Sequence, residues 1–371
     1  MRLEVWYSDK FLPQEVRTAL SFTKVTDFAS LRTNTVDVYH LLQLWAMMSS
    51  FLLIIFILLG VCDVQGAADF RVCAFNLQHF GDAKAKKSNV MQTLVKIISR
   101  CDVCLLQEVR DSRGKAMPQL LDHIDRFDTK HRYETVASQR LGRSDTYQEQ
   151  YVFVYRADTV TVTAQYQYPD DRPGDVDAFS REPFVVRFRA PTTAIKEFVL
   201  IPQHTSPTNT TKELDALYDV LQHVKTMWKT ENVMLLGDFN ADCGYLAKKN
   251  RKNVRLLTDS SLLWLIVDNT DTTVRSTTSC TYDRIVVHGE RFASKVVPNS
   301  AKPFNFQTEY GLTEEQALEV SDHYPVEVLL RPDASRSFFS DGNSGSGMAN
   351  KVVSHFGLLP LFLLSHILSA W

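Results

Sequence analysis

The sequence lacks a strong net charge. Its 371 residues include 41 Lys and Arg and 43 Asp and Glu, so the formal net charge is −2 at pH 7. A chain so nearly neutral has no global basic field that would hold it on nucleic acid or on an anionic membrane. This argues against a tight, non-enzymatic DNA-binding protein. It says little against an enzyme, because an enzyme has to release its product.

Cysteine is also scarce, with six residues in the chain. Cys101 and Cys104 form a C-x-x-C pattern, but the residues around Cys104 are strand-like, and successive strand residues face opposite ways. No second Cys/His pair at metal spacing accompanies them, so we expect buried free thiols rather than a redox pair or a zinc site. Cys243 and Cys280 flank polar loops and are the best disulfide candidates for an exported chain. Cys62 lies in the N-terminal apolar run.

Between residues 69 and 331 the chain lacks a linker, a repeat or a low-complexity segment, which predicts one domain. Strand-like runs alternate with few amphipathic helices, and this favours stacked sheets flanked by helices. Apolar residues at helical spacing predict a helix over 90–98, and Thr210 with Glu213 forms a capping-box pattern that predicts a second helix start. The expected strands are 70–76, 103–108, 149–156, 159–168, 184–189, 197–204, 233–236, 262–267, 282–287 and 324–330.

The apolar run Phe51–Val61 has the length of the hydrophobic region of a signal peptide and is short for a membrane span. Small residues follow it and suit cleavage near Gly66 or Ala68. The stretch that precedes it is far longer than a signal needs. We therefore expect residues 1–46 to be a non-native extension, from an alternative start or a gene-model error, and 47–66 to be a signal peptide. A signal anchor is the less favoured alternative.

A second apolar segment, 356–371, runs to the last residue with no basic residue after it. A spanning helix normally carries basic residues on its cytoplasmic side. Small residues, a spacer and a terminal apolar tail are instead the pattern of a GPI-attachment signal. We expect 333–355 to be a linker with the attachment region, with Ser344, Gly345 or Ser346 as the attachment residue. A degenerate tail that is left on or trimmed is the alternative.

Asn209 begins an N-glycosylation sequon, which can be used only if the chain is exported. These features together predict passage through the secretory pathway and an extracellular or cell-surface location. The membrane contact would then be made through the GPI anchor.

Polar side chains gather where five of the expected strands end. The heptad GDFNADC, residues 237–243, follows a buried apolar run, and taken alone it is equally consistent with an Asx turn and with the edge of an active site. Strand ends are where α/β folds build their sites, so we interpret the five clusters as loops that converge on one site. The other four clusters are 75–81, 105–112, 201–207 and 319–325.

These clusters offer oxygen ligands without a Cys/His cage, which suits Mg²⁺, Mn²⁺ or Ca²⁺. They also contain His79, His204 and His323, each of which can act as acid or base if a carboxylate orients its ring. Two His–carboxylate pairs around an oxygen-ligated cation describe a phosphodiesterase. Spacing does not say which two histidines those are, and each alone is as well explained as a core or loop histidine.

Six motifs together resemble the deoxyribonuclease I family, and the resemblance is unbroken from about residue 70 to 331. It implies an α/β single domain over 69–332, built as a four-layer α/β/β/α sandwich. It also implies divalent-metal-dependent endonucleolytic cleavage of double-stranded DNA that leaves 5′-phosphate ends. The apolar tail favours the membrane-anchored deoxyribonuclease-I-like branch. The motifs are FNLQHFG, LLQEVRDS, AFSREPFVV, GDFNADC, TYDRIVV and SDHYPVEV.

By this resemblance, His204 pairs with Glu149 and His323 pairs with Asp283, and the two histidines are the general acid and base in an order that stays open. His79 matches no catalytic position. The remaining implied roles fall into three groups. Around the scissile phosphate, Glu108 and Asp322 would bind the catalytic Mg²⁺ or Mn²⁺ with Asn76 beside it, and Asp238 and Asn240 would hold phosphate, water or metal. Structural Ca²⁺ would bind Asp271 and Thr273 at one site, and Asp177, the Phe179 carbonyl and Glu182 at another. DNA would contact Arg110 and Arg181 through phosphates, and Arg143 and Tyr147 in the minor groove.

The resemblance also pairs Cys243 with Cys280, and it leaves three departures. The loop 170–177 lacks a small disulfide, so the second calcium site is expected to be weaker. The loop before Glu149 is one residue longer than usual, which weakens the case for the Arg143 contact. Actin binding is not expected, because Thr135, Ala137 and Gln139 differ from the actin-gripping residues, and we expect a monomer.

Two other functions remain open at this stage. One is a lipid or inositol phosphodiesterase or phosphatase of the same superfamily, and the other is a catalytically silent anchored binding protein. Both His–carboxylate pairs are present in the sequence, which argues against the silent protein.

Overall fold

The computed structural model describes residues 47–48, 70–171, 173 and 177–334. Apart from Met47 and Met48, the expected N-terminal extension, signal peptide, attachment residues and apolar tail lie outside this part of the chain. Contacts divide the chain into units 1–65 and 66–371. None of the helices in the described residues is long and apolar enough to cross a membrane.

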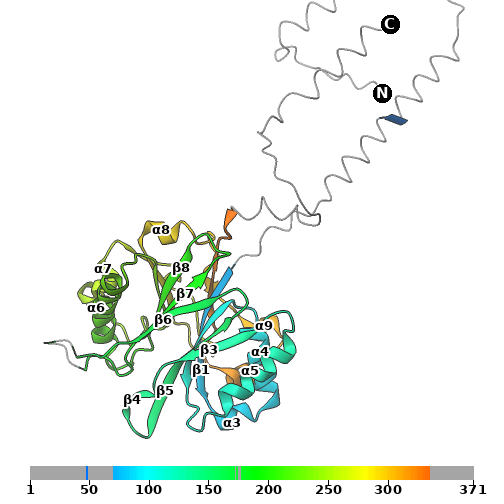
Figure 1. Ribbon diagram of the computed structural model, residues 1–371. Coiled ribbons are helices and arrows are strands. Elements are labelled where there is room, and N and C mark those ends of the chain that lie inside the picture. Colours follow the sequence, from blue (N-terminus) through cyan, green and yellow to red (C-terminus); the bar gives the residue numbers. More distant parts are fainter. Residues whose placement is uncertain (1–46, 49–69, 172, 174–176, 335–371) are drawn as a thin grey trace, which may run out of the picture. The chain divides into compact units, whose positions relative to one another are not determined.

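The described strands form a seven-stranded and a six-stranded mixed sheet (Figure 1). The order in the first sheet is β12-β13-β1-β2-β5-β3, with β4 paired to β5, and the order in the second is β10-β11-β9-β8-β7-β6. The first sheet consists of β1 Phe70–Phe80, β2 Val103–Val109, β3 Tyr133–Ala137, β4 Leu141–Ser144, β5 Tyr147–Arg156, β12 Lys302–Pro303 and β13 Val326–Leu330. The second consists of β6 Thr161–Gln167, β7 Phe184–Ala190, β8 Lys196–Pro202, β9 Val233–Asp238, β10 Leu262–Trp264 and β11 Asp283–His288.

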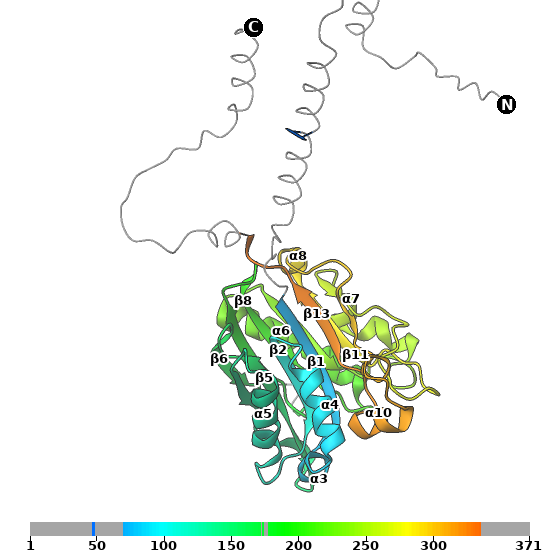
Figure 2. The same ribbon diagram turned by 90° about the vertical axis from the view of Figure 1, so that its right-hand side faces the viewer.

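Helices cover the outer face of each sheet, and Figures 1 and 2 show α6 and α4 on opposite sides of the sandwich. The α-helices are α3 Asp82–Ala85, α4 Ser88–Ile98, α5 Ala116–Phe127, α6 Thr210–Trp228, α7 Arg255–Thr258, α8 Gly289–Ala293, α9 Phe306–Glu309 and α10 Glu314–Val320, with a 3₁₀ helix at Lys248–Asn253. In each sheet one long helix joins a parallel strand pair, as α4 joins β1 to β2 and α6 joins β8 to β9.

The four layers follow from the alternation of side chains along each strand. On β1, Val72 packs between the two sheets while its neighbour Cys73 packs against α4 and α5. On β8, Leu200 packs between the sheets and Ile201 packs against α6. Three apolar cores therefore separate four layers, and the expected α/β/β/α sandwich is confirmed.

The expected strands exist, but several boundaries differ. β1 continues past Asn76 to Phe80, and its register against β2 shifts between these two residues. The capping box at Thr210 is wrong, because Asn209 precedes the helix and neither side chain caps it. Glu213 instead accepts hydrogen bonds from Ser180 Oγ at 2.9 Å and Gln203 Nε2 at 3.1 Å. A buried carboxylate with such partners is not free to cap its own helix.

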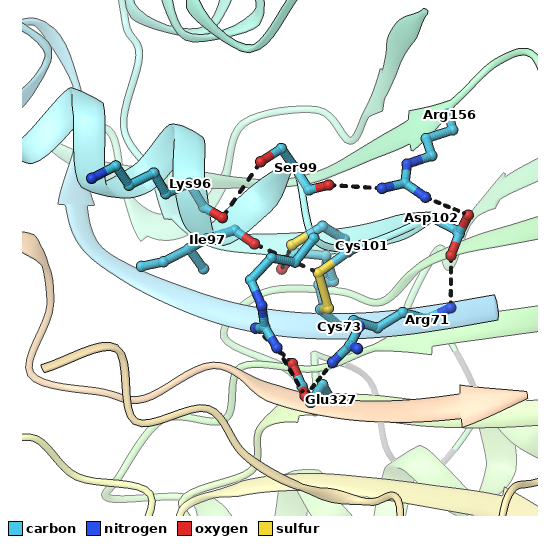
Figure 3. The surroundings of a disulfide bond; sticks show 12 residues. Arg71, Cys73, Lys96, Ile97, Ser99, Cys101, Asp102, Arg156 and Glu327 are labelled. Carbon is cyan, nitrogen blue, oxygen red and sulfur yellow. Dashed lines mark hydrogen bonds and ion pairs between the residues drawn. A yellow bond between two sulfur atoms is a disulfide. The ribbon is translucent and has the colours of Figure 1, made fainter. Parts of the chain in front are cut away.

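The cysteine pairing corrects one expectation and confirms another. Cys243 and Cys280 form the expected disulfide, whereas Cys101 is bonded to Cys73 instead of being a free thiol. Cys104 is free and buried, as expected, and burial raises the pKa of its thiol above the usual range. Figure 3 shows the Cys73–Cys101 bond next to the end of α4. The bond could not be foreseen from local pattern, because it depends on how β1 lies beside the turn that enters β2.

Candidate active site

Two histidine–carboxylate pairs form at one edge of the sandwich. His204 Nδ1 lies 3.1 Å from Glu149 Oε1, and His323 Nδ1 lies 2.7 Å from Asp283 Oδ2, where a hydrogen bond forms. His204 follows β8 of the second sheet and Glu149 lies on β5 of the first, while His323 precedes β13 of the first sheet and Asp283 begins β11 of the second. Each pair therefore takes its histidine from one sheet and its carboxylate from the other.

Asp238 lies between the two histidines. Its Oδ2 is 3.6 Å from Nε2 of His204 and 3.6 Å from Nε2 of His323, and it accepts a hydrogen bond from Asn76 Nδ2 at 3.1 Å. Asn240 is next to it, with its backbone N–H donating to Asp238 Oδ1 at 3.0 Å. The heptad 237–243 is therefore both an Asx turn and the centre of the candidate site, so the two readings of this stretch are not exclusive.

Gln107 joins the two sheets directly behind Asp238. Its Nε2 donates to the carbonyl oxygen of Gln203 at 2.8 Å, and its Oε1 accepts from the backbone N–H of Asp238 at 2.9 Å. Gly237 has a φ of 129°, and a Cβ added there would lie 2.4 Å from the Gln203 carbonyl oxygen and 2.6 Å from Gln107 Nε2. Only glycine permits this approach. Sequence reasoning missed Gln107, whose only local signal was its place in β2 within the polar cluster 105–112.

Glu108 provides an ionised carboxylate beside the two pairs. Its Oε1 accepts from Asn76 Nδ2 at 3.0 Å, and its Oε2 accepts from the backbone N–H of His79 at 3.0 Å and lies 2.7 Å from His79 Nδ1. Burial opposes ionisation, but the hydrogen bond from His79 and the charge of His204 outweigh it and lower the pKa of Glu108 below its usual range. His79, expected to be an ordinary loop histidine, thus contacts a predicted cation ligand.

Burial would keep both paired histidines neutral, but their carboxylates reverse this. For His204, burial and the Arg181 guanidinium lower the pKa, and Glu149 and Asp238 raise it further, so the net shift is upward. For His323, burial is outweighed by Asp283 and Asp238, and the pKa is well above 6.5. In both pairs the neighbouring carboxylates therefore stabilise the protonated ring.

Arg181 lies beneath the first pair and is only 8% exposed. Its Nη1 lies 2.7 Å from Glu149 Oε1, and its Nε and Nη2 donate to the carbonyl oxygen of His204 at 3.0 and 2.9 Å. The expected phosphate contact of Arg181 stays a prediction. The structure adds that this guanidinium orients both members of the pair.

The other expected DNA-contacting residues lie at the rim. The Arg110 guanidinium lies 4.2 Å from the centre of the Tyr147 ring, and the His79 ring meets the same tyrosine edge to face at 6.0 Å. Tyr147 is 40% exposed. Arg143 instead binds the 177–179 segment, with Nη1 2.5 Å from Asp177 Oδ2 and Nη2 3.1 Å from the carbonyl oxygen of Phe179.

These contacts bear on the expected cation sites. Ligand atoms of Asp177, Glu182 and Asp170 lie within 4.8 Å of one another, and Arg143 places a positive group against Asp177 and the Phe179 carbonyl. The three carboxylates form a candidate cation group in which Asp170 is a member that sequence reasoning missed, but Arg143 already binds two of the expected ligands, Asp177 and the Phe179 carbonyl. At the other expected calcium site, the two members contact each other. Asp271 Oδ1 accepts from the backbone N–H of Thr273 at 2.9 Å and from its hydroxyl at 2.6 Å.

The residues expected to hold the catalytic cation also offer a suitable donor set. Glu108 is ionised and Asp322 is 40% exposed, with Oδ1 4.0 Å from His323 Nε2. Oε2 of Glu149 and Oδ1 of Asp283 are buried and make no hydrogen bond in the described part of the chain, whereas Oε1 of Glu149 is paired with Arg181 and His204. A site rich in carboxylate oxygens, with no thiolate, fits Mg²⁺, Mn²⁺ or Ca²⁺.

Comparison with known proteins places this geometry in a family. The model of the endonuclease/exonuclease/phosphatase family matches residues 73–323. Deoxyribonuclease gamma of Rattus norvegicus is 48% identical over 293 residues, which cover 78% of this chain and 93% of that protein. Deoxyribonuclease-1-like 1 of Homo sapiens is 48% identical over 280 residues, covering 76% and 90% of the two chains. Deoxyribonuclease-1 of Mus musculus is 48% identical over 269 residues, covering 72% and 94%.

The three relatives are equally identical to this chain, so identity alone does not select one branch among them. With the sandwich, the two pairs and the matched region in agreement, the chain belongs to the deoxyribonuclease I family within the endonuclease/exonuclease/phosphatase family.

Proposed function

We propose that this chain is a divalent-cation-dependent endonuclease that hydrolyses phosphodiester bonds of double-stranded DNA with little sequence specificity. The observation that carries the proposal is the convergence of both histidine Nε2 atoms on Asp238 Oδ2, each at 3.6 Å. Two proton-transfer groups on either side of one point are what in-line displacement at phosphorus requires.

The reaction needs one proton removed and one delivered. One histidine accepts a proton from the attacking water as oxygen bonds to phosphorus, and the other protonates the 3′ oxygen as the P–O3′ bond breaks, which leaves a 5′-phosphate end. Glu149 and Asp283 hold the two rings in orientation and stabilise their protonated forms. Asp238 and Asn240 lie where water and phosphate meet the rings.

A divalent cation would be held by Glu108 and Asp322, with Asn76 orienting Glu108, and when bound it would offset the charge of the phosphate. We propose Mg²⁺ or Mn²⁺ there and Ca²⁺ at the Asp177 cluster. The pairing of carboxylate and carboxamide oxygens without thiolates supports these hard cations over zinc.

DNA binding is expected to be local. The partly exposed Arg110 packs on the exposed ring of Tyr147 at the rim of the site, and the chain as a whole carries almost no net charge. Few phosphate contacts predict a shallow dependence of affinity on salt. Readout from the minor groove is degenerate, which agrees with low sequence specificity.

The decisive experiment is nicking of supercoiled plasmid by the wild type, His204→Ala and His323→Ala, with Mg²⁺ and Ca²⁺ or with EDTA. We expect nicking by the wild type with cations only and losses of several orders of magnitude in both variants. His123→Ala is the control, because His123 is a partly exposed residue of α5 whose ring contacts its own helix. Wild type that nicks equally in EDTA would disprove the cation requirement. An inert wild type would redirect attention to lipid and inositol phosphodiesters.

We also propose that the chain enters the secretory pathway, carries a glycan on Asn209, and reaches the cell surface as a GPI-anchored monomer. Two disulfides among the described residues and the exposure of Asn209 support export. Release from cells by a phosphatidylinositol-specific phospholipase, a mass shift on deglycosylation, and a mature N-terminus after residue 66 are the expected results. A mature chain that begins before Phe51 would contradict cleavage here.

A further inference from the structure

Lys84 is a half-buried ammonium beside the candidate site that the proposed mechanism does not use. It lies on the short helix α3, and its Nζ donates to three backbone carbonyl oxygens, those of Leu77 at 2.8 Å, Gln78 at 2.7 Å and Val320 at 2.9 Å. An ammonium has three N–H donors, so all of them are used on the backbone. The acceptors belong to two segments far apart in sequence, and both carry site residues.

The first segment depends on an unfavourable backbone conformation. Gln78 and His79 have φ values of 46° and 60° in the left-handed region. This turn directs the backbone N–H of Gln78 to Asn76 Oδ1 at 2.9 Å and that of His79 to Glu108 Oε2 at 3.0 Å. Left-handed backbone is energetically unfavourable for a non-glycine residue. The Lys84 ammonium binds the carbonyl groups of this turn and so offsets part of that cost.

The second segment leads into Asp322 and His323. Val320, whose carbonyl takes the third hydrogen bond, is followed by Ser321, and Ser321 Oγ donates to the backbone carbonyl of Asn76 at 2.6 Å. The same hydroxyl accepts from the backbone N–H of His323 at 3.0 Å. Lys84 and Ser321 therefore form two adjacent links between the segment that orients Glu108 and the segment that carries Asp322.

The electrostatic surroundings of Lys84 keep its ammonium charged at neutral pH. Burial lowers the pKa of Lys84 to about 8, while Asp322 and Glu108 attract the ammonium and limit the fall. Lys87 and Glu319 are the other charged groups that act on it. Glu108 and Asp322, the two expected cation ligands, thus lie within electrostatic reach of one ammonium.

From this geometry we propose that Lys84 is a positioning residue that sets the spacing of Glu108 and Asp322, and thereby the affinity of the site for its catalytic cation. The inference rests on the proposed function. A purely structural lysine would change stability alone. A positioning lysine changes cation affinity and turnover in protein that is fully folded.

The test uses the full chain with Lys84→Met, which keeps the length and removes the donors, and Lys84→Arg, whose planar fork cannot direct three N–H groups as the ammonium does. Lys87→Met is the matched control, because Lys87 is 49% exposed and its Nζ contacts only Glu319 among the described acidic groups. Binding of Mn²⁺ without DNA is followed by electron paramagnetic resonance, and Glu108→Gln identifies the signal of the catalytic site. Thermal unfolding gives the folded fraction.

We expect Lys84→Met to weaken Mn²⁺ binding at the Glu108 site and to lower kcat by about 10–100-fold, the range for residues that orient metal ligands. KM for plasmid should stay within about twofold, because Arg110 and Tyr147 are untouched. Lys84→Arg should show the same losses and Lys87→Met none. Mn²⁺ affinity equal to that of the wild type in folded Lys84→Met would overturn the inference.

Failure of the inference and failure of the proposed function give different results. A wild type that nicks with cations while Lys84→Met matches it in Mn²⁺ affinity and kcat refutes the positioning role alone. A wild type that does not nick refutes the proposed function, and the Mn²⁺ titration without DNA then still decides the role of Lys84.

Discussion

Replacing Gly237 by alanine tests whether the contact between the two sheets is as close as the structure shows. The added Cβ meets two obstacles. The backbone φ of 129° is one that L-residues rarely adopt, and the Cβ would lie 2.4 Å from the carbonyl oxygen of Gln203. Backbone strain of this kind costs about 1–3 kcal/mol.

The steric obstacle adds a second cost. To make room, the Gln107 amide has to leave its hydrogen bonds with the Gln203 carbonyl and with the Asp238 N–H. Leaving buried polar groups unpaired costs about 1–3 kcal/mol. We therefore expect Gly237→Ala to lower the free energy of unfolding by about 2–6 kcal/mol, the sum of both costs.

Two other glycines separate these costs. Gly311 has a φ of 62° with nothing within 4 Å of an added Cβ, so Gly311→Ala should show strain alone, about 1–2 kcal/mol. Gly244 has open space and no positive φ, so Gly244→Ala should change stability by less than about 0.5 kcal/mol. Urea unfolding followed by tryptophan fluorescence gives the three values. Equal losses for Gly237→Ala and Gly311→Ala would refute the close sheet contact.

Three further outcomes are expected. Replacing Cys73 and Cys101 together by alanine should lower the free energy of unfolding by about 3 kcal/mol, because the bond closes a loop with a sequence separation of 28, and no loss of stability would show that the bond does not form. The pKa of His323 is raised in the folded state, so its stabilisation by Asp283 is complete below about pH 6.5 and is lost as pH rises through the folded-state pKa. His323→Ala should therefore lower Tm more at pH 6 than at pH 9 without metal, and a pH-independent difference would contradict the ion pair. Tyr147→Ala should raise KM for DNA several-fold with little change in the dependence on Mg²⁺, and an unchanged KM would place the DNA elsewhere.

Much of the fold was predictable because strand alternation and helical spacing are local. The boundaries were less so. β1 extends to Phe80 through a register shift held by contacts with β2, and no local pattern indicates it. The same applies to Glu213, which fits a capping box by sequence but bonds Ser180, 33 positions away.

For the site, the residue types and the family motifs indicated which side chains matter, and the structure brings both histidines to the expected carboxylates. Spacing alone could not pair them, because each pair joins different sheets. The roles of Gln107 and Lys84 were not predictable for a related reason. Their hydrogen bonds go to backbone atoms of distant segments, and because every residue has a backbone carbonyl, the sequence does not indicate which one accepts.

Each histidine pair takes its histidine from one sheet and its carboxylate from the other, and this has a consequence for the synthesis of the chain. β13 lies between β12 and β1, so the first sheet is complete only after residues 326–330 have been made. His323 comes just before them, and its carboxylate partner comes from the other sheet. A ribosome that stops before His323 releases a chain with one histidine pair at most. The second histidine pair of the proposed nuclease is thus completed only when translation of its catalytic region is nearly finished.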